Sequence, residues 1–197
     1  MRKIVLASGS PRRKKLLEQI GLDFTVSESG YEEKSLPDAN PAEVAKFLSL
    51  EKANLAAVKH KDSIIIAADT VVVIGNEILG KPSSEEEARE MLRKLSDNTH
   101  SVITGFTIID TKHNKTFTSF VETKVTFKDL SELEMAAYVE TGEPLDKAGA
   151  YAVQGKGGLF VKKIEGDYFN VVGLPIFAVS QALSDFGVDI LGAYEEQ

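Results

Sequence analysis

The chain has 197 residues, 43% of them hydrophobic, so it is long enough to bury the core of one domain. It contains no cysteine, which excludes disulfides, thiolate metal sites and thiol nucleophiles, so that carboxylates or its three histidines must hold any metal. A net charge of −7 argues against general nucleic-acid binding, because a duplex would be repelled unless one face were strongly basic.

The first part of the chain alternates predicted strands and helices. An apolar strand over 3–7 is followed by a helix that begins at Pro11, since Ser10 is a good N-cap and proline is favoured at the first helical position. Further elements are a strand over 24–27, a helix over 41–60 capped by Asn40, and a β-branched strand over 63–68 that continues through 71–74. These apolar runs are too short to cross a bilayer, and residues 1–3 lack the apolar stretch of a secretory signal, so we expect a cytosolic protein that does not bind membranes.

The second part continues the alternation. We predict a helix over 85–95, two long strands over 101–111 and 116–127 joined by a hairpin turn at His113-Asn114, a helix over 131–140 capped by Ser131 and Glu134, short strands within the glycine-rich stretch 142–173, and a final helix over 175–186. This order predicts an α/β or α+β fold with a mixed sheet. We treat residues 1–197 as a single domain whose acidic end, 195–197, is a disordered tail.

Residues 8–13, Ser-Gly-Ser-Pro-Arg-Arg, place two arginines in the first turn of the first predicted helix. Cations oppose the helix dipole there, which indicates that an anion such as phosphate lies between them and the backbone N–H groups. The alternative is that Arg12 and Arg13 are solvated and pair with nearby acids, since opposing the dipole at an exposed site costs only about 0.3–1 kcal/mol.

Asp69 is a carboxylate at the end of a strongly apolar strand, in the sequence Ala-Ala-Asp-Thr. Ligand sites in open α/β sheets lie at the carboxyl ends of strands, and an ionised aspartate there needs a metal, a cation or water to offset its desolvation. Asp69 is therefore a candidate general base or metal ligand. The alternative is an aspartate that only starts a turn before Val71.

Residues 75–82, Gly-Asn-Glu-Ile-Leu-Gly-Lys-Pro, come close to a phosphate-binding P-loop. That motif requires Ser or Thr after the lysine and a helix beginning there, whereas Pro82 has no hydroxyl and disfavours helical geometry at Lys81. The sequence therefore argues against a P-loop kinase or GTPase, and Lys81 is kept as a phosphate contact.

Taken together, these segments resemble the Maf family of nucleoside triphosphate pyrophosphatases, once described as septum-formation inhibitors, and the resemblance spans nearly the whole chain. The order and spacing of the matching positions carry it: 8–13, Glu33, 52–53, 68–72, 80–82, 104–105, 141–144, 146–151, 154–155 and 170–175.

This resemblance implies a two-lobed mixed-sheet fold related to inosine triphosphate pyrophosphatases, with a cleft between the lobes, and hydrolysis between the α and β phosphates of a nucleoside triphosphate. Asp69 would be the proton acceptor that activates water and, with Glu33, would hold a divalent ion. Magnesium or manganese is favoured because the chain offers hard oxygen ligands. The residues implied in phosphate binding are Ser8, Arg13, Lys52 and Lys81.

Arg12, Thr70 and Gln154 match the subgroup that prefers dTTP and UTP, whose products are the monophosphate and pyrophosphate. A glutamine amide can donate to and accept from a thymine or uracil base. The alternative is that Thr70 only continues its strand and Gln154 only closes a loop. The resemblance also implies roles in the removal of modified pyrimidine nucleotides and in septum formation. A homodimer is compatible with it.

Two rival functions differ in class. One is a nucleotide-binding regulator of cell division that has no significant turnover, and the other is a sugar-phosphate or base-modifying enzyme that uses the same anion site. Release of pyrophosphate rather than orthophosphate separates all three.

Overall fold

The computed structural model describes residues 2–28, 30–31 and 40–192, which form two compact units. The described residues of unit 1 fall within the segments Met1–Asp69, Thr104–Val121 and Gly173–Gln197, and unit 2 consists of Thr70–Ile103 and Glu122–Val172. The chain passes from one unit to the other within long strands, so that Asp69 is the last residue of its segment of unit 1 and Thr70 the first of unit 2.

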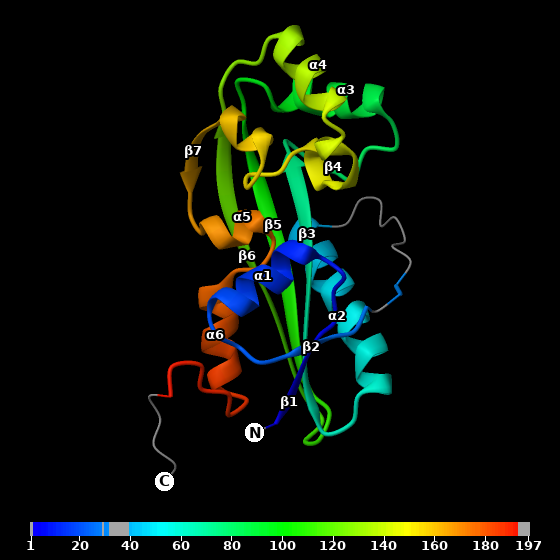
Figure 1. Cartoon of the computed structure of the whole chain (residues 1–197), viewed down its shortest axis with the longest axis vertical. Helices are drawn as coiled ribbons and strands as arrows, with labels where there is room; N and C mark the ends of the chain where they lie inside the picture. The colour runs from blue at the N-terminus through cyan, green and yellow to red at the C-terminus, as the bar shows by residue number, and fades with distance from the viewer. Residues whose placement is uncertain (1, 29, 32–39, 193–197) are drawn as a thin grey trace. The chain divides into compact units, whose positions relative to one another are not determined.

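The strands form a seven-stranded mixed sheet in the order β2-β1-β3-β5-β6-β7, with β4 paired to β3 (Figure 1). Their bounds are Lys3–Leu6 (β1), Thr25–Val26 (β2), Ser63–Ile74 (β3), Glu77–Leu79 (β4), Thr99–Asp110 (β5), Lys115–Phe127 (β6) and Val161–Glu165 (β7). Strand β1 is parallel to β2 and β3, whereas β4 is antiparallel to β3 and β7 is antiparallel to β6. The predicted mixed-sheet α/β fold is confirmed.

The predicted helices begin within a residue of where the sequence places them. The helices are Pro11–Gln19 (α1), Pro41–Lys59 (α2), Glu85–Leu95 (α3), Glu132–Glu140 (α4), Tyr168–Val172 (α5) and Ile176–Ser184 (α6), with 3₁₀ turns at Glu143–Asp146 (η1), Ala148–Ala150 (η2) and Lys156–Phe160 (η3). The predicted caps are formed, because the side chains of Ser10, Asn40 and Ser131 each accept a backbone N–H of the first turn. Such a bond satisfies one of the donors that a helix start leaves without an intrahelical partner.

In unit 1, helix α2 packs closely against the strands. Ala53 and Ala56 of α2 share a buried cluster with residues of β1, β3 and β5. A Cβ added to Gly105 of β5 would lie only 2.3 Å from the carbonyl carbon and oxygen of Ala45. The absence of a side chain at Gly105 therefore allows α2 to approach the sheet, and α2 carries Lys52.

Unit 2 has its own core, in which α3 and α4 cover apolar residues of β3, β5 and β6. His100 is buried there, with its ring edge-on to those of Phe127 and Tyr151, and its Nε2 lies 2.8 Å from the Tyr151 hydroxyl. This burial lowers the pKa of His100 to about 4, so the ring is neutral at physiological pH.

The stretch 142–173 differs from its prediction. We expect short strands there, and the structure has one, β7, together with three 3₁₀ turns and the short helix α5 that were not expected. Gly142 and Gly149 adopt positive φ angles of 73° and 67°, which turn the chain and interrupt extended structure. The predicted tail at 195–197 lies outside the described residues.

Candidate active site

The turn between β1 and α1 holds Arg13 by two hydrogen bonds. Arg13 Nη1 donates to the buried Ser8 hydroxyl at 3.2 Å, and Arg13 Nε donates to the carbonyl of Gly173 at 2.8 Å. Ser8 Oγ also accepts the N–H of Ser10 at 3.2 Å. The predicted phosphate residues Ser8 and Arg13 are therefore in contact, and the fixed guanidinium lies at the positive end of a helix.

Arg12 is half-buried in the same first turn, which contains no acidic residue. Within the part of the chain that the structure describes, its side chain makes no hydrogen bond or ion pair, so pairing with a nearby acid is not observed. A cation in this position suits an anionic ligand, because the helix dipole and the guanidinium both attract negative charge.

Asp69 forms a buried ion pair with Lys52 of α2. Only 9% of the Asp69 side chain and 12% of the Lys52 side chain is exposed. Asp69 lies inside β3 rather than at its end, contrary to the expectation, because the β-branched residues after it continue the strand. The lysine supplies the cation that an aspartate in this apolar strand requires.

The register of the sheet places the Ser8 turn beside the strand that leads to Asp69. Leu6 of β1 pairs with Ile66 of the parallel strand β3, and the N–H of Ala7 donates to the Ile66 carbonyl at 2.8 Å. Both strands point the same way, so the chain beyond β1 and the chain beyond Ile66 continue on the same side of unit 1. Two arginines, a lysine and a carboxylate thus come from adjoining elements, an arrangement suited to a polyanion and to accepting a proton.

Three predicted residues belong to unit 2, namely Thr70, Lys81 and Gln154. Thr70 is half-buried within β3, whereas Lys81 and Gln154 are exposed. Thr70 does continue its strand, as the alternative holds, but a residue within a strand can still present its hydroxyl to a ligand. The base contacts of Thr70 and Gln154 stay predictions.

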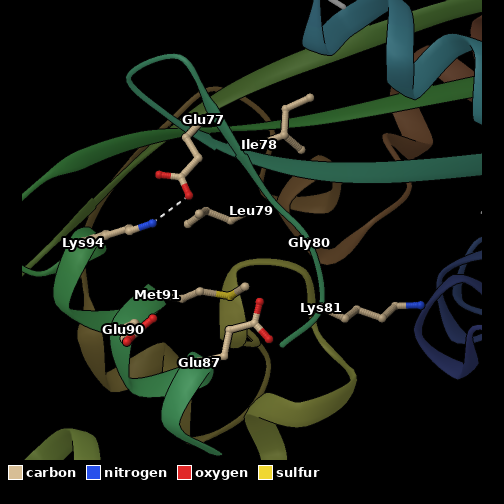
Figure 2. A pocket seen from close by; sticks show the side chains of 9 residues that line it. All are labelled: Glu77, Ile78, Leu79, Gly80, Lys81, Glu87, Glu90, Met91 and Lys94. Atoms are coloured by element: carbon tan, nitrogen blue, oxygen red, sulfur yellow. Dashed lines mark hydrogen bonds and ion pairs between the residues drawn. The ribbon is translucent and has the colours of Figure 1, made fainter. Parts of the chain in front are cut away.

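Lys81 borders a pocket in unit 2 whose lining includes Glu77, Glu87 and Glu90 (Figure 2). Figure 2 shows the Lys81 side chain extending away from these carboxylates, while Lys94 forms an ion pair with Glu77. Glu77 is neutralised by Lys94, but Glu87 and Glu90 still give the pocket a negative charge that would repel a triphosphate, so we assign no nucleotide site to it. If Lys81 contacts a phosphate, it does so outside this pocket, on the side toward which its ammonium group points (Figure 2).

Of the two predicted metal ligands, Asp69 and Glu33, the structure describes only Asp69, because Glu33 lies outside the described residues. Among residues 2–28, 30–31 and 40–192, no group of three or more histidines, aspartates or glutamates is arranged to hold a metal. In the same part of the chain, no helix has the length and apolar character needed to span a membrane.

Comparison with known proteins shows a family match. A family model described as "Maf-like protein" matches residues 3–186. The curated "dTTP/UTP pyrophosphatase" of Bacillus cereus strain AH820 is 49% identical over 193 residues, which cover 98% of this chain and 100% of that protein. The protein with the same description from Bacillus anthracis is also 49% identical, with the same coverage.

Solved structures support the fold. A HAM1 protein from Coxiella burnetii matches with a TM-score of 0.53 at 13% identity, covering 94% of this chain and 100% of that one. The Ham1 protein of Staphylococcus aureus matches with a TM-score of 0.53 at 16% identity and covers 95% of this chain and 100% of its own.

Proposed function

The chain belongs to the Maf family, and on that basis we propose that it hydrolyses dTTP and UTP to the nucleoside monophosphate and pyrophosphate. The observation that carries this proposal is the buried Lys52–Asp69 pair in the unit that also holds the Ser8–Arg13 turn. Relatives described as dTTP/UTP pyrophosphatases, 49% identical along nearly the whole chain, support the choice of substrate.

In the proposed reaction, Asp69 removes a proton from a water molecule. The water oxygen attacks the α phosphorus, the bond from that phosphorus to the bridging α–β oxygen breaks, and pyrophosphate leaves with the electron pair. Asp69 holds the proton until it passes to solvent. The ion pair with Lys52 fixes the carboxylate in position before substrate arrives, so that little reorganisation is needed during the reaction.

The cations bind and neutralise the triphosphate in this proposal. Arg13 is already oriented by Ser8 and Gly173, which lowers the entropy lost when a phosphate binds it. Lys52 and Lys81 are proposed as further phosphate contacts. Because negative charge moves onto the leaving pyrophosphate, positive charge held in a fixed geometry stabilises the transition state.

We propose that a magnesium or manganese ion assists the reaction, with Asp69 and Glu33 as its protein ligands. The donor set fits such an ion, because Mg²⁺ is commonly bound by one or two carboxylates together with substrate phosphates rather than by a complete protein cage. When bound, it would supply positive charge next to the phosphates. Asp69 remains the proton acceptor in the proposal.

Selection among bases is proposed to rest on Arg12, Thr70 and Gln154. Thymine and uracil each present two carbonyl acceptors and one N–H, which a glutamine amide can match with a donor and an acceptor. A site built on such bonds rejects ligands that leave its polar groups unpaired. We expect Gln154→Ala to erode the preference for dTTP and UTP over ATP and GTP.

The test is Asp69→Asn, with pyrophosphate release from dTTP as the measurement. We expect turnover to fall by orders of magnitude, because an amide cannot accept the proton. Asp110→Asn is a matched control, since Asp110 is also a buried strand aspartate of unit 1 that pairs with a cation, Arg2. The control should lose stability and keep kcat. Near-normal turnover by Asp69→Asn would show that the base lies elsewhere.

The role of the protein in the cell is a separate part of the proposal. We propose that the protein acts in the cytoplasm, removes modified pyrimidine nucleotides and influences septum formation. Expression of Asp69→Asn in dividing cells separates hydrolysis from binding, since a regulator without turnover would arrest division equally well in either form. Binding of dTTP without pyrophosphate release would favour that regulator. A homodimer stays a prediction for sedimentation to test.

A further inference from the structure

The candidate base-selecting residue Gln154 lies in an exposed part of unit 2. Between η2, which ends at Ala150, and η3, which begins at Lys156, the chain forms neither strand nor helix. Within this connection the N–H of Gly155 donates to the Ala152 carbonyl at 3.2 Å, which closes a tight turn around Gln154. A single turn of this kind does not by itself hold an exposed side chain in one place.

The turn is bound from outside by the carboxylate of Glu143. Glu143 Oε2 accepts the backbone N–H of Lys156 at 3.1 Å, and Glu143 Oε1 accepts that of Gly157 at 3.2 Å. Both donors lie shortly after Gln154 in the sequence. Glu143 itself is in η1, which closely follows α4, so the turn is attached to a neighbouring helical element.

Tyr138 of α4 completes the attachment. Its hydroxyl donates to Glu143 Oε1 at 2.9 Å and accepts the N–H of Ala152 at 3.3 Å. The tyrosine is buried, and both burial and the hydrogen bond to Glu143 raise its pKa, so the hydroxyl remains a donor at physiological pH. Tyr138 therefore holds the residue two positions before Gln154, while Glu143 holds the residues two and three positions after it.

Two glycines allow the backbone to lie directly on these groups. A Cβ at position 155 would be 2.3 Å from Glu143 Oε1, and a Cβ at position 157 would be 2.7 Å from the Tyr138 hydroxyl oxygen. The Gly155 φ of −123° is open to any residue, so close approach rather than backbone conformation explains the glycine. The segment is thus shaped around the two side chains.

Glu143 is suited to this role as a carboxylate. Partial burial opposes its ionisation, but the N–H groups of Gly157 and Lys156 and the Tyr138 hydroxyl outweigh that effect and lower its pKa. An ionised carboxylate has only acceptors, which matches the three donors that point at it.

We propose that Glu143 and Tyr138 are positioning residues that hold residues 152–157 so that Gln154 can select pyrimidine nucleotides. The inference rests on the proposed function of Gln154. Discrimination by hydrogen bonds requires the amide to be held within a fraction of an ångström, and both ends of the turn are attached through the same carboxylate–phenol pair.

The experiment replaces Glu143 by glutamine in the full-length protein and measures kcat and KM for dTTP, UTP and ATP. The amide keeps the size but has one acceptor oxygen, so one backbone N–H loses its acceptor and faces an NH₂ group. We expect kcat/KM for dTTP and UTP to fall about tenfold, mainly through KM, with ATP changed less than about twofold. A merely destabilised enzyme would lose activity toward every nucleotide in the same proportion.

Glu134→Gln is the matched control. Glu134 is a carboxylate of the same unit that accepts the N–H and hydroxyl of Ser131 and pairs with Lys128, at the other end of α4. Its replacement should lower stability and leave the ratio of dTTP to ATP efficiency unchanged. Tyr138→Phe should lower the ratio of dTTP to ATP efficiency, as Glu143→Gln does. If Glu143→Gln does not fold, Tyr138→Phe tests the positioning role in its place.

The outcomes distinguish this inference from the proposed function. If Gln154→Ala erodes the pyrimidine preference while Glu143→Gln and Tyr138→Phe retain it, the positioning role is overturned and the proposed function stands. If Gln154→Ala itself retains the preference, the assignment of Gln154 fails and the inference fails with it. If the wild-type protein releases no pyrophosphate, the proposed function is wrong.

Discussion

Replacing Gly105 by alanine tests how the fold positions Lys52. A Cβ at this position would lie 2.3 Å from the carbonyl carbon and oxygen of Ala45 and 2.5 Å from the N of Lys46. All three are backbone atoms of α2, so no side chain can rotate away to make room. Ordinary van der Waals contact begins at 3.4 Å, so α2 or β5 must move by about 1 Å.

The expected cost follows from this displacement. Overpacking a buried site typically costs about 1–3 kcal/mol, and a chain of this size loses roughly 2–4 °C in Tm for each kcal/mol. We therefore expect Tm to fall by about 2–12 °C. The reduced backbone entropy of the unfolded alanine variant offsets only about 0.4–1 kcal/mol.

Activity should fall further than stability alone explains. Lys52 lies about two helical turns after Ala45 on the same helix, so a shift of α2 also moves its ammonium group relative to Asp69. A misplacement of about 1 Å in a catalytic arrangement can cost roughly 100-fold in rate.

The assays are thermal unfolding, which gives Tm, and pyrophosphate release from dTTP. The activity assay is run well below the Tm of the variant. Gly80→Ala is the stability control, because a Cβ there meets nothing within 4 Å. Its free energy of unfolding should change by no more than about 0.5 kcal/mol, as for an ordinary surface substitution. A Gly105→Ala protein with wild-type Tm and wild-type kcat would refute the close packing of α2 on β5 and the argument built on it.

Three further predictions concern stability and cofactor dependence. The Arg2 guanidinium, followed by bonds from the His113 ring and nearby backbone N–H groups, holds the pKa of Asp110 well below its usual range, so Asp110→Asn should cost about 1–3 kcal/mol near pH 7 in urea unfolding. That loss should shrink below about pH 4, where the unfolded aspartate becomes protonated; an equal loss at pH 3 and pH 7 would contradict it. The folded pKa of His100 is about 4 and its ordinary value is 6.5, so as pH falls below 6.5 the unfolded state takes up a proton before the folded state does. This proton uptake lowers the free energy of unfolding by up to about 3 kcal/mol as pH approaches 4. His100→Gln should flatten the stability profile across that window, and an unchanged profile would place the titration elsewhere. Turnover should stop when a chelator removes divalent ions and return with magnesium or manganese, whereas full activity in excess chelator would exclude the metal role proposed for Asp69.

The short-range features of the fold follow from the sequence. Ser131 and Glu134 are three residues apart, and their reciprocal capping bonds depend only on that spacing and on the adjacent helix. The same holds for Ser10 before Pro11, and for the β-branched residues that extend β3. The resemblance to the Maf family is carried by motifs in a fixed order along the chain, and the family match confirms it.

Tertiary structure alone decided which distant groups meet. Lys52 pairs with Asp69 because α2 packs on the strand that carries the aspartate, and Arg13 reaches the carbonyl of Gly173 because the last segment of unit 1 returns beside the first. In the glycine-rich stretch the sequence predicted short strands and only β7 forms, because a strand needs a neighbour to bond with and positive φ angles turn the chain away from one. Glu143 stood among the family motifs, but its spacing could not show which N–H groups it binds. Local patterns depend on residues within a turn or two of each other, whereas these contacts depend on the order of the strands and on the packing of the helices against them.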